Sequence, residues 1–250
     1  NIEGDNDEAL NKLRALSAAE IIDGGEETAG QGGPITYPGP IHDGRLVTET
    51  AESSYKAGRQ PNVPIIIGSN SAEVPAGFVN ANSKEELLSL FGNYKEEAIA
   101  AYDSDGNTDF AKMLTLVNTD KVWAEPARFT ARAFTSKSTP VYLYLFSYVP
   151  VSMKDWMRYG AAHASEIAYV FDNLAERNGV IFTAKDKEVG KIMNAYWVNF
   201  AKTGNPNGKG LPLWPVYDST KNEVFEFTQD GSGGNFFDHR KARLDVIEKA

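Results

Sequence analysis

Two short runs of β-branched and aromatic residues, separated by long helical patterns, most constrain the fold of this chain. The first run, residues 63–68, ends at Gly68, and the second, residues 141–148, follows Pro140. Short apolar runs bounded by turn residues predict strands, and the first is apolar enough to be buried on both faces. Strands separated by long helical segments favour a mixed, mainly parallel sheet covered by helices. The sequence therefore predicts an α/β fold.

The other predicted elements agree with this class. Residues 188–202 form the clearest helix, because apolar side chains recur on one face and Gly204 follows as a C-terminal cap. A third strand is predicted at residues 224–228. Further helices are predicted at residues 7–16, 17–22, 93–102, 108–134 with a bend near Pro126, and 241–249. Residues 23–40, rich in Gly and Pro, predict a loop.

Composition excludes several classes of partner. The 250 residues carry 25 basic and 34 acidic side chains, a net charge of -9, and show no basic stripe, so we expect no nucleic-acid partner. Apolar runs stop at about eight residues, well short of the roughly 20 that span a bilayer, so we expect no membrane segment. The absence of Cys fits a bacterial cytoplasm without excluding secretion, so localisation stays open.

Two titratable residues follow the two predicted strands. Glu73 comes shortly after Gly68, and His163 lies among Gly160, Ala161 and other small residues that permit close approach. The carboxyl ends of strands are where open α/β sheets build active sites. The residues alone leave open that Glu73 is a solvated surface charge and that His163 is structural.

Two weaker candidates carry less. Alternating acids at residues 103–109 are similar to a calcium loop, but Gly106 stands at the fourth position and Leu114 at the twelfth, so a turn between helices is the default expectation. His42 and His239 have polar neighbours and no supporting pattern. We therefore expect no metal and no cofactor.

Several motifs in order carry a family resemblance across nearly the whole chain. VPIIIGSN-x-x-E (from Val63) and H-x-x-E (from His163), the latter followed by IAYVF, resemble type-B carboxylesterases, the cholinesterase and para-nitrobenzyl esterase group. DEALNKLRALSAAEII, PIHDGRLV, YLYLF, NAYWVNFAKTGNPNG and LPLWPVYD are also similar to segments of that family.

The resemblance implies an α/β-hydrolase fold whose triad runs Ser, acid, His along the chain. Carried over by position, Glu73 is the acid and His163 the base. The implied activity is serine-type hydrolysis of neutral carboxylic esters through an acyl-enzyme. Glu166, one helical turn after His163, resembles a buried acid of the family that braces the site, although a structural hydrogen bond is the plainer reading.

The chain departs from the family at the nucleophile. It contains no Gly-x-Ser-x-Gly and no His-Gly-Gly run for oxyanion-hole amides. In the family both precede the matched region, so we expect residues 1–250 to be the C-terminal portion of one α/β-hydrolase domain. We further expect the chain to be inactive alone and to dock with the N-terminal half of the same esterase as a separate chain.

The acid position itself departs from the family. The sequence Ala72-Glu73-Val74 stands where the family has Asp-Glu-Gly, which puts the local backbone path in question. Phe78, Trp156 and Tyr159 are candidate pocket residues, with ordinary core as the alternative. The rival function is a non-catalytic binding or adhesion module that keeps the fold; a third reading is an α/β domain of unrelated function. The ester substrate is not predictable from these residues.

Overall fold

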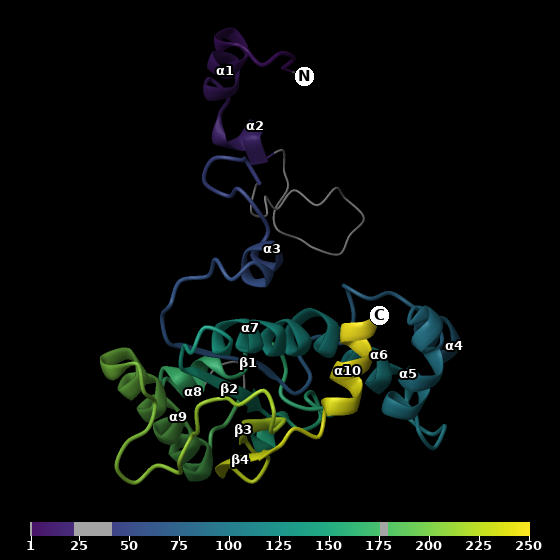
Figure 1. Ribbon diagram of the computed structural model, residues 1–250, viewed down its shortest axis with the longest axis vertical. Helices are drawn as coiled ribbons and strands as arrows, with labels where there is room; N and C mark the ends of the chain where they lie inside the picture. The colour runs from purple at the N-terminus through teal and green to yellow at the C-terminus, as the bar shows by residue number, and fades with distance from the viewer. Residues whose placement is uncertain (1, 23–41, 176–179) are drawn as a thin grey trace. The chain divides into compact units, whose positions relative to one another are not determined.

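The computed structural model describes residues 2–22, 42–175 and 180–250 (Figure 1). It divides the chain into two compact units, Asn1–Ser53 and Ser54–Ala250. In the first unit, α1 (Asp7–Arg14) begins after Asn6, whose side chain accepts a hydrogen bond from the Ala9 N–H, and α2 (Ala18–Ile22) follows. Both predicted helices are confirmed to within two residues at each end, whereas the predicted loop at residues 23–40 lies outside the described residues.

The second unit contains a four-stranded sheet in the order β1-β2-β3-β4. Its strands are β1 (Ile65–Asn70), β2 (Val141–Phe146), β3 (Glu223–Phe227) and β4 (Gly233–Phe237). β1 pairs with β2 and β2 with β3 in parallel, while β3 and β4 are antiparallel. The predicted mixed, mainly parallel sheet is confirmed. β4 was not predicted, because its Gly-Gly start carries little strand propensity.

β1 lies at an edge of the sheet that the described residues form. The prediction that this strand is buried on both faces is wrong for its first half, since Ile65, Ile66 and Ile67 are only partly buried. Within the described part of the chain, β1 has a strand neighbour on one side alone.

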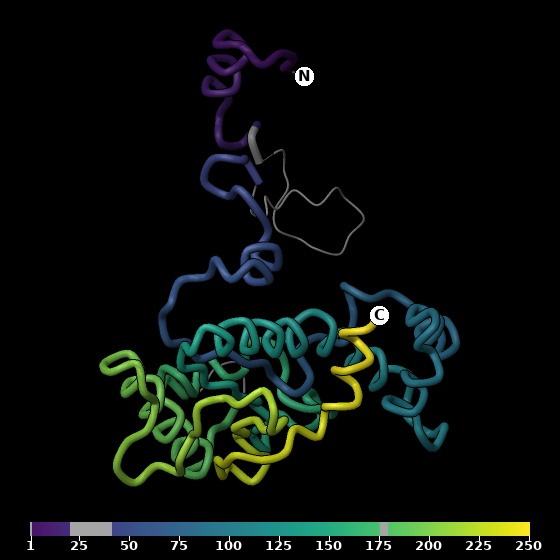
Figure 2. Tube along the Cα trace, viewed as in Figure 1, coloured from purple at the N-terminus to yellow at the C-terminus, as the bar shows by residue number. Residues whose placement is uncertain are grey.

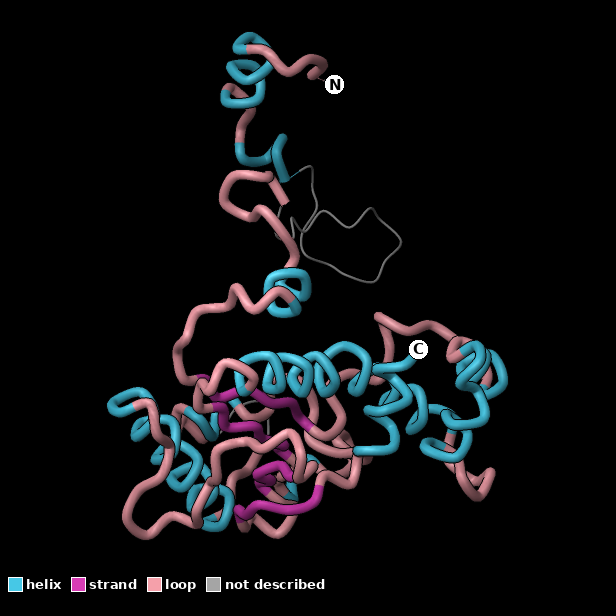
Figure 3. Tube along the Cα trace, in the orientation of Figure 1, coloured by secondary structure: helices cyan, strands magenta, loops and turns pink. Residues whose placement is uncertain are grey.

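Side chains of β2 alternate between two hydrophobic cores, as the two-residue period of a strand requires. Val141, Leu143 and Leu145 pack in one core with α7 (Glu125–Thr135). Tyr142 and Phe146 pack in another core with α9 (Ala184–Thr203). Figure 3 shows the strands in magenta among the cyan helices. Helices therefore cover both faces of the sheet, as predicted.

The long helix α9 begins four residues earlier than predicted. Thr183 and Asp186 form a reciprocal capping box at its start, which satisfies backbone N–H groups that the helix leaves unpaired. The helix ends at Gly204, whose φ of 73° is left-handed, as the expected C-terminal cap requires.

A helical segment connects β1 to β2. Its elements are α4 (Lys84–Ser89), η1 (Gly92–Tyr94), α5 (Lys95–Tyr102), α6 (Phe110–Thr119), the π-helical turn η2 (Asp120–Ala124) and α7. The bend predicted near Pro126 corresponds to η2, which comes directly before the first turn of α7, where Pro126 lies. A π-helical turn inside a longer helix often marks a functional site.

The remaining elements are α3 (Ala51–Lys56), η3 (Val151–Met153), α8 (Ile167–Val170) and α10 (Lys241–Lys249). α10, yellow in Figure 2, packs against α5 and α7. Among the helices of the described residues, none combines the length and hydropathy that a membrane span requires.

Candidate active site

The loop that carries Glu73, called the acid loop below, continues directly from β1. Its backbone keeps contact with the sheet, because Ser71 N–H donates to the carbonyl of Phe146 at 2.9 Å. Glu73 is 5% exposed, and its N–H donates to Thr119 Oγ1 at 2.9 Å. Glu73 Oε1 accepts from the N–H of Asn70 at 2.7 Å. The end of its own strand therefore holds the Glu73 carboxylate, and α6 holds the Glu73 backbone.

The loop that carries His163, called the histidine loop below, follows β2 and is hydrogen-bonded to the acid loop at several points. Ala161 N–H donates to Ser71 Oγ at 2.9 Å, and Ala72 N–H donates to the Ala161 carbonyl at 2.9 Å. Gly160 has φ +141°, and a Cβ there would lie 2.5 Å from Ser71 Oγ. A side chain at position 160 would push the loops apart, which confirms the expected role of small residues near His163.

These bonds bring Glu73 and His163 into direct contact. His163 Nδ1 lies 2.7 Å from Glu73 Oε2, and the His163 N–H donates to the Glu73 carbonyl at 2.8 Å. When the carboxylate is ionised and the ring neutral, Nδ1 donates in this contact and the lone pair lies on Nε2. The His163 side chain is 56% exposed. The contact with Glu73 therefore orients a ring that remains more than half exposed.

Asn70 and Glu166 brace the same corner. Asn70 is 1% exposed, and its Nδ2 donates to the Ala162 carbonyl at 2.8 Å and to Glu166 Oε2 at 2.5 Å. Glu166 therefore makes a side-chain hydrogen bond at this corner, as the structural interpretation expected. Burial raises the pKa of Tyr144, and the carboxylates of Glu166 and Glu73 raise it further. The two carboxylates thus lie near a common phenol, yet of the two, Glu73 is the one bonded to the histidine ring.

Two bracing residues were missed in the sequence. Asn70, three residues before Glu73, ends a strand and could have been found as a polar residue at a site-forming position. Thr119 lies 46 residues from Glu73, and no local pattern marks it.

An open cavity of about 460 Å³ adjoins the pair. Glu73 and His163 line it together with Pro75, Trp156, Met157 and Tyr159. Trp156 and Tyr159 thus lie where pocket residues were expected. Ester-sized small molecules bind in mostly apolar clefts of this size.

Two aromatic side chains pack in succession beside His163. The Trp123 ring lies 5.3 Å from the His163 ring, and the Phe78 ring meets Trp123 edge-on at 5.2 Å. Phe78 is 62% exposed. Phe78 is therefore neither ordinary core nor one of the residues that line the cavity, and it reaches the site only through Trp123.

The acidic residues 103–109 form the turn between α5 and α6. Asp103 pairs with Lys84 Nζ at 2.9 Å and accepts from the Thr108 N–H at 2.7 Å. Asp109 accepts from the Lys112 N–H at 3.0 Å and caps α6. In the described ranges, no group of three or more His, Asp or Glu residues could hold a metal ion.

The sequence is similar to a known protein family and to individual proteins. A family model described as "Carboxylesterase family" matches residues 2–244. Acylcarnitine hydrolase from Rattus norvegicus is 37% identical over 179 residues, 62% of this chain and 32% of that protein. Cocaine esterase from Homo sapiens is 33% identical over 134 residues, 53% of this chain and 24% of that protein.

Solved structures share the fold. The carboxylesterase EST55 of Geobacillus stearothermophilus has a TM-score of 0.72 at 26% identity, over 93% of this chain and 50% of that chain. A PNB esterase has a TM-score of 0.71 at 23% identity, over 98% of this chain and 52% of that chain. The chain thus has part of an α/β-hydrolase fold. It spans about half the length of these structures and a third or less of the two curated relatives.

Proposed function

The chain belongs to the carboxylesterase family, and on that premise we propose that it supplies the acid and base of a Ser-Glu-His triad that hydrolyses carboxylic esters. The observation that carries the proposal is the 2.7 Å contact between Glu73 Oε2 and His163 Nδ1, with the ring half-exposed beside the cavity. A solvated acid or a structural histidine would not need this combination.

Each group has a defined task in the reaction. Nε2 of His163 takes the proton of a serine hydroxyl as the oxygen attacks the ester carbonyl, and then gives it to the leaving alcohol. Glu73 holds the ring by Nδ1 and stabilises the imidazolium cation. In the second half of the reaction, the same Nε2 takes a proton from the water that cleaves the acyl-enzyme.

The nucleophile is proposed to come from outside these 250 residues. The sequence has no Gly-x-Ser-x-Gly, and among the described residues no hydrogen bond to His163 Nε2 is present. A companion segment or chain would bring the serine and the oxyanion-hole amides, and the 250 residues alone would not hydrolyse esters. We call this combination the assembled esterase.

Labelling with an organophosphonate, followed by peptide mass mapping, tests the proposal. The adduct should form on a serine outside this sequence, His163→Ala should abolish it, and the exposed control His42→Ala should leave it intact. An adduct on a serine within the 250 residues would overturn the assignment. An assembled protein that takes no label and hydrolyses no ester would instead favour the binding or adhesion module.

A further inference from the structure

The wall of the site cavity carries one positive charge that the triad does not use. Three residues lining the cavity are Glu73, His163 and Arg158. The Glu73 carboxylate is buried and faces His163. Arg158 is exposed. Among the described residues its guanidinium has no direct ion pair, but it lies near enough to Asp109 and to the Tyr159 hydroxyl that its charge acts to lower the pKa of both. Its guanidinium is the group of this wall that can meet a negative charge on a bound molecule.

A stacked tyrosine holds the guanidinium at the wall. The Arg158 Cζ lies 4.5 Å from the centre of the Tyr159 ring. The Tyr159 hydroxyl donates to Asp109 Oδ1 at 2.6 Å. This bond raises the pKa of Tyr159 and lowers that of Asp109. Asp109 itself does not line the cavity. Its carboxylate accepts from the Tyr159 hydroxyl and from the Lys112 N–H in the first turn of α6, and the Arg158 charge acts on it as well.

The backbone beside Arg158 is also fixed. Gly160 and Ala161 are the residues bonded to or packed on Ser71 of the acid loop. Arg158 is therefore two residues before Gly160, where the contacts with Ser71 that position the loop of His163 begin. The backbone that carries Arg158 is thus anchored close to the loop of His163, which favours pre-organised recognition of a bound molecule.

The chemistry of the wall defines the ligand. Pro75, Trp156 and Met157 supply apolar surface, while an exposed arginine binds carboxylates in a planar, two-bond geometry. We propose that Arg158 determines substrate specificity and selects carboxylic esters that carry a carboxylate beside an apolar body. This inference rests on the proposed function and departs from the expectation of neutral esters.

Paired substrates test it in the assembled esterase. Mono-p-nitrophenyl glutarate, with an acyl-side carboxylate, is compared with p-nitrophenyl butyrate. 4-Acetoxybenzoate, with a carboxylate on the alcohol side, is compared with phenyl acetate. Arg158→Gln should lower kcat/KM for the anionic ester of at least one pair about tenfold, mainly through KM. Neutral esters should change less than about twofold, since they make no charged contact with position 158.

Three further variants sharpen the result. Arg158→Glu should fall below Arg158→Gln on anionic esters, because it adds repulsion, while Arg158→Lys should recover part of the loss. Lys154→Gln is the matched control, since Lys154 is exposed, lies four residues away and does not line the site cavity.

Two outcomes would overturn the inference. One is an equal loss of kcat/KM on neutral and anionic esters in Arg158→Gln. The other is the same selective loss on anionic esters in Lys154→Gln, which would indicate that the overall positive charge of this surface matters and not a contact at position 158. Failure of the proposed function is distinguishable, because no ester of either charge would then be hydrolysed and no phosphonate adduct would form.

Discussion

Two buried carboxylates of this chain, Asp238 and Glu73, face their basic partners in opposite ways. Asp238 accepts two side-chain hydrogen bonds from Arg240, both at 2.9 Å, and both side chains are at most 5% exposed. Glu73 accepts one from His163, whose side chain is 56% exposed.

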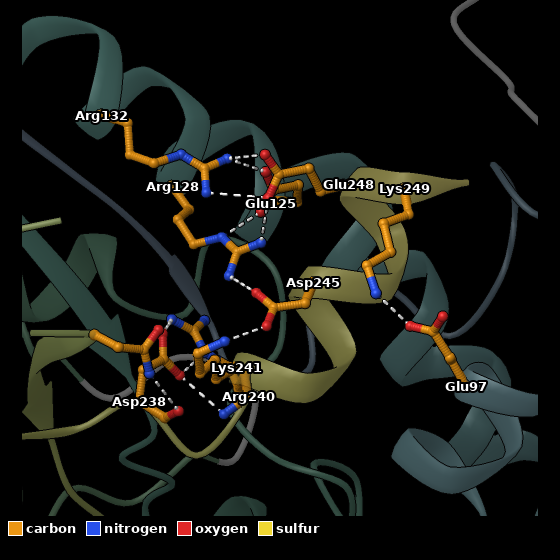
Figure 4. Close-up of polar contacts among 11 residues, drawn as sticks. Glu97, Glu125, Arg128, Arg132, Asp238, Arg240, Lys241, Asp245, Glu248 and Lys249 are labelled. Carbon is orange, nitrogen blue, oxygen red and sulfur yellow. Dashed lines mark hydrogen bonds and ion pairs between the residues drawn. The ribbon is translucent and has the colours of Figure 1, made fainter. Parts of the chain in front are cut away.

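The difference separates a permanent ion pair from the pair that we propose is catalytic. Arg240 stays protonated throughout the accessible pH range, so its pair with Asp238 is permanent. Histidine can gain and lose a proton, and an exposed ring can exchange it with a substrate. Figure 4 shows that Asp238 and Arg240 lie near other ion pairs, among them Arg128 with Asp245 on α10. We therefore expect mutations in the two regions to affect different measurements.

The largest effect should come from removing the base. In the assembled esterase, His163→Ala should lower kcat by about 10⁴-fold or more, because no other group accepts the serine proton. The urea midpoint of unfolding should change little, since the ring is half-exposed. A variant with normal kcat, or one that unfolds in buffer, would erase the contrast between the two regions.

Breaking the permanent ion pair should act on stability. Asp238→Asn removes the one carboxylate that Arg240 bonds directly and leaves its buried charge with only the weaker influence of Asp120 and Glu226. The change should cost up to about 3–5 kcal/mol in the free energy of unfolding, with kcat of the folded fraction unchanged. Equilibrium urea unfolding measures the free energy of unfolding. Turnover divided by the concentration of active sites, titrated from the acylation burst, measures kcat of the folded fraction. An unchanged midpoint would show that the pair contributes nothing.

The same pair predicts a pH dependence. Burial acts to raise the pKa of Asp238, but the charge and hydrogen bonds of Arg240 outweigh it, so the pKa lies below its ordinary value of 3.8. A lowered folded-state pKa gives stability that is complete above pH 3.8 and lost as the pH falls through the folded-state value. The stability difference between the native chain and Asp238→Asn should therefore narrow in acid. A difference that widens below pH 3.8 would contradict this.

The smallest effect is expected at an exposed pair near the same cluster. Lys249 on α10 binds Glu97 on α5, with side chains 46% and 52% exposed (Figure 4). Water and salt screen such pairs. Lys249→Ala should leave the urea midpoint within experimental error, and a shift as large as that of Asp238→Asn would mean that burial does not explain the ranking.

Sequence patterns could predict the framework because its elements depend on local signals, such as the periodicity that marks β2 and α9. The assignment of Glu73 and His163 rested instead on the ordered family motifs, since the residues alone left a surface acid and a structural histidine open. The edge position of β1 could not be predicted, since an apolar run does not say how many strands flank it. Thr119 became visible only when segments far apart in sequence met in space, because its contact with Glu73 joins residues with no common local pattern. Asn70 did carry a local signal, its place at the end of a strand.

The central claim is that Glu73, and not the neighbouring Glu166, orients the base. Both carboxylates accept a hydrogen bond from Asn70: Glu73 accepts from the Asn70 backbone N–H, and Glu166 accepts from the Asn70 side chain. Glu73→Gln and Glu166→Gln therefore form a matched pair of variants. The decisive measurement is kcat/KM of the assembled esterase for one p-nitrophenyl ester. We expect Glu73→Gln to lose about 10⁴-fold, as when a triad carboxylate is replaced by its amide, and Glu166→Gln to lose less than about tenfold. Equal losses, or a larger loss in Glu166→Gln, would contradict the assignment of Glu73 as the acid.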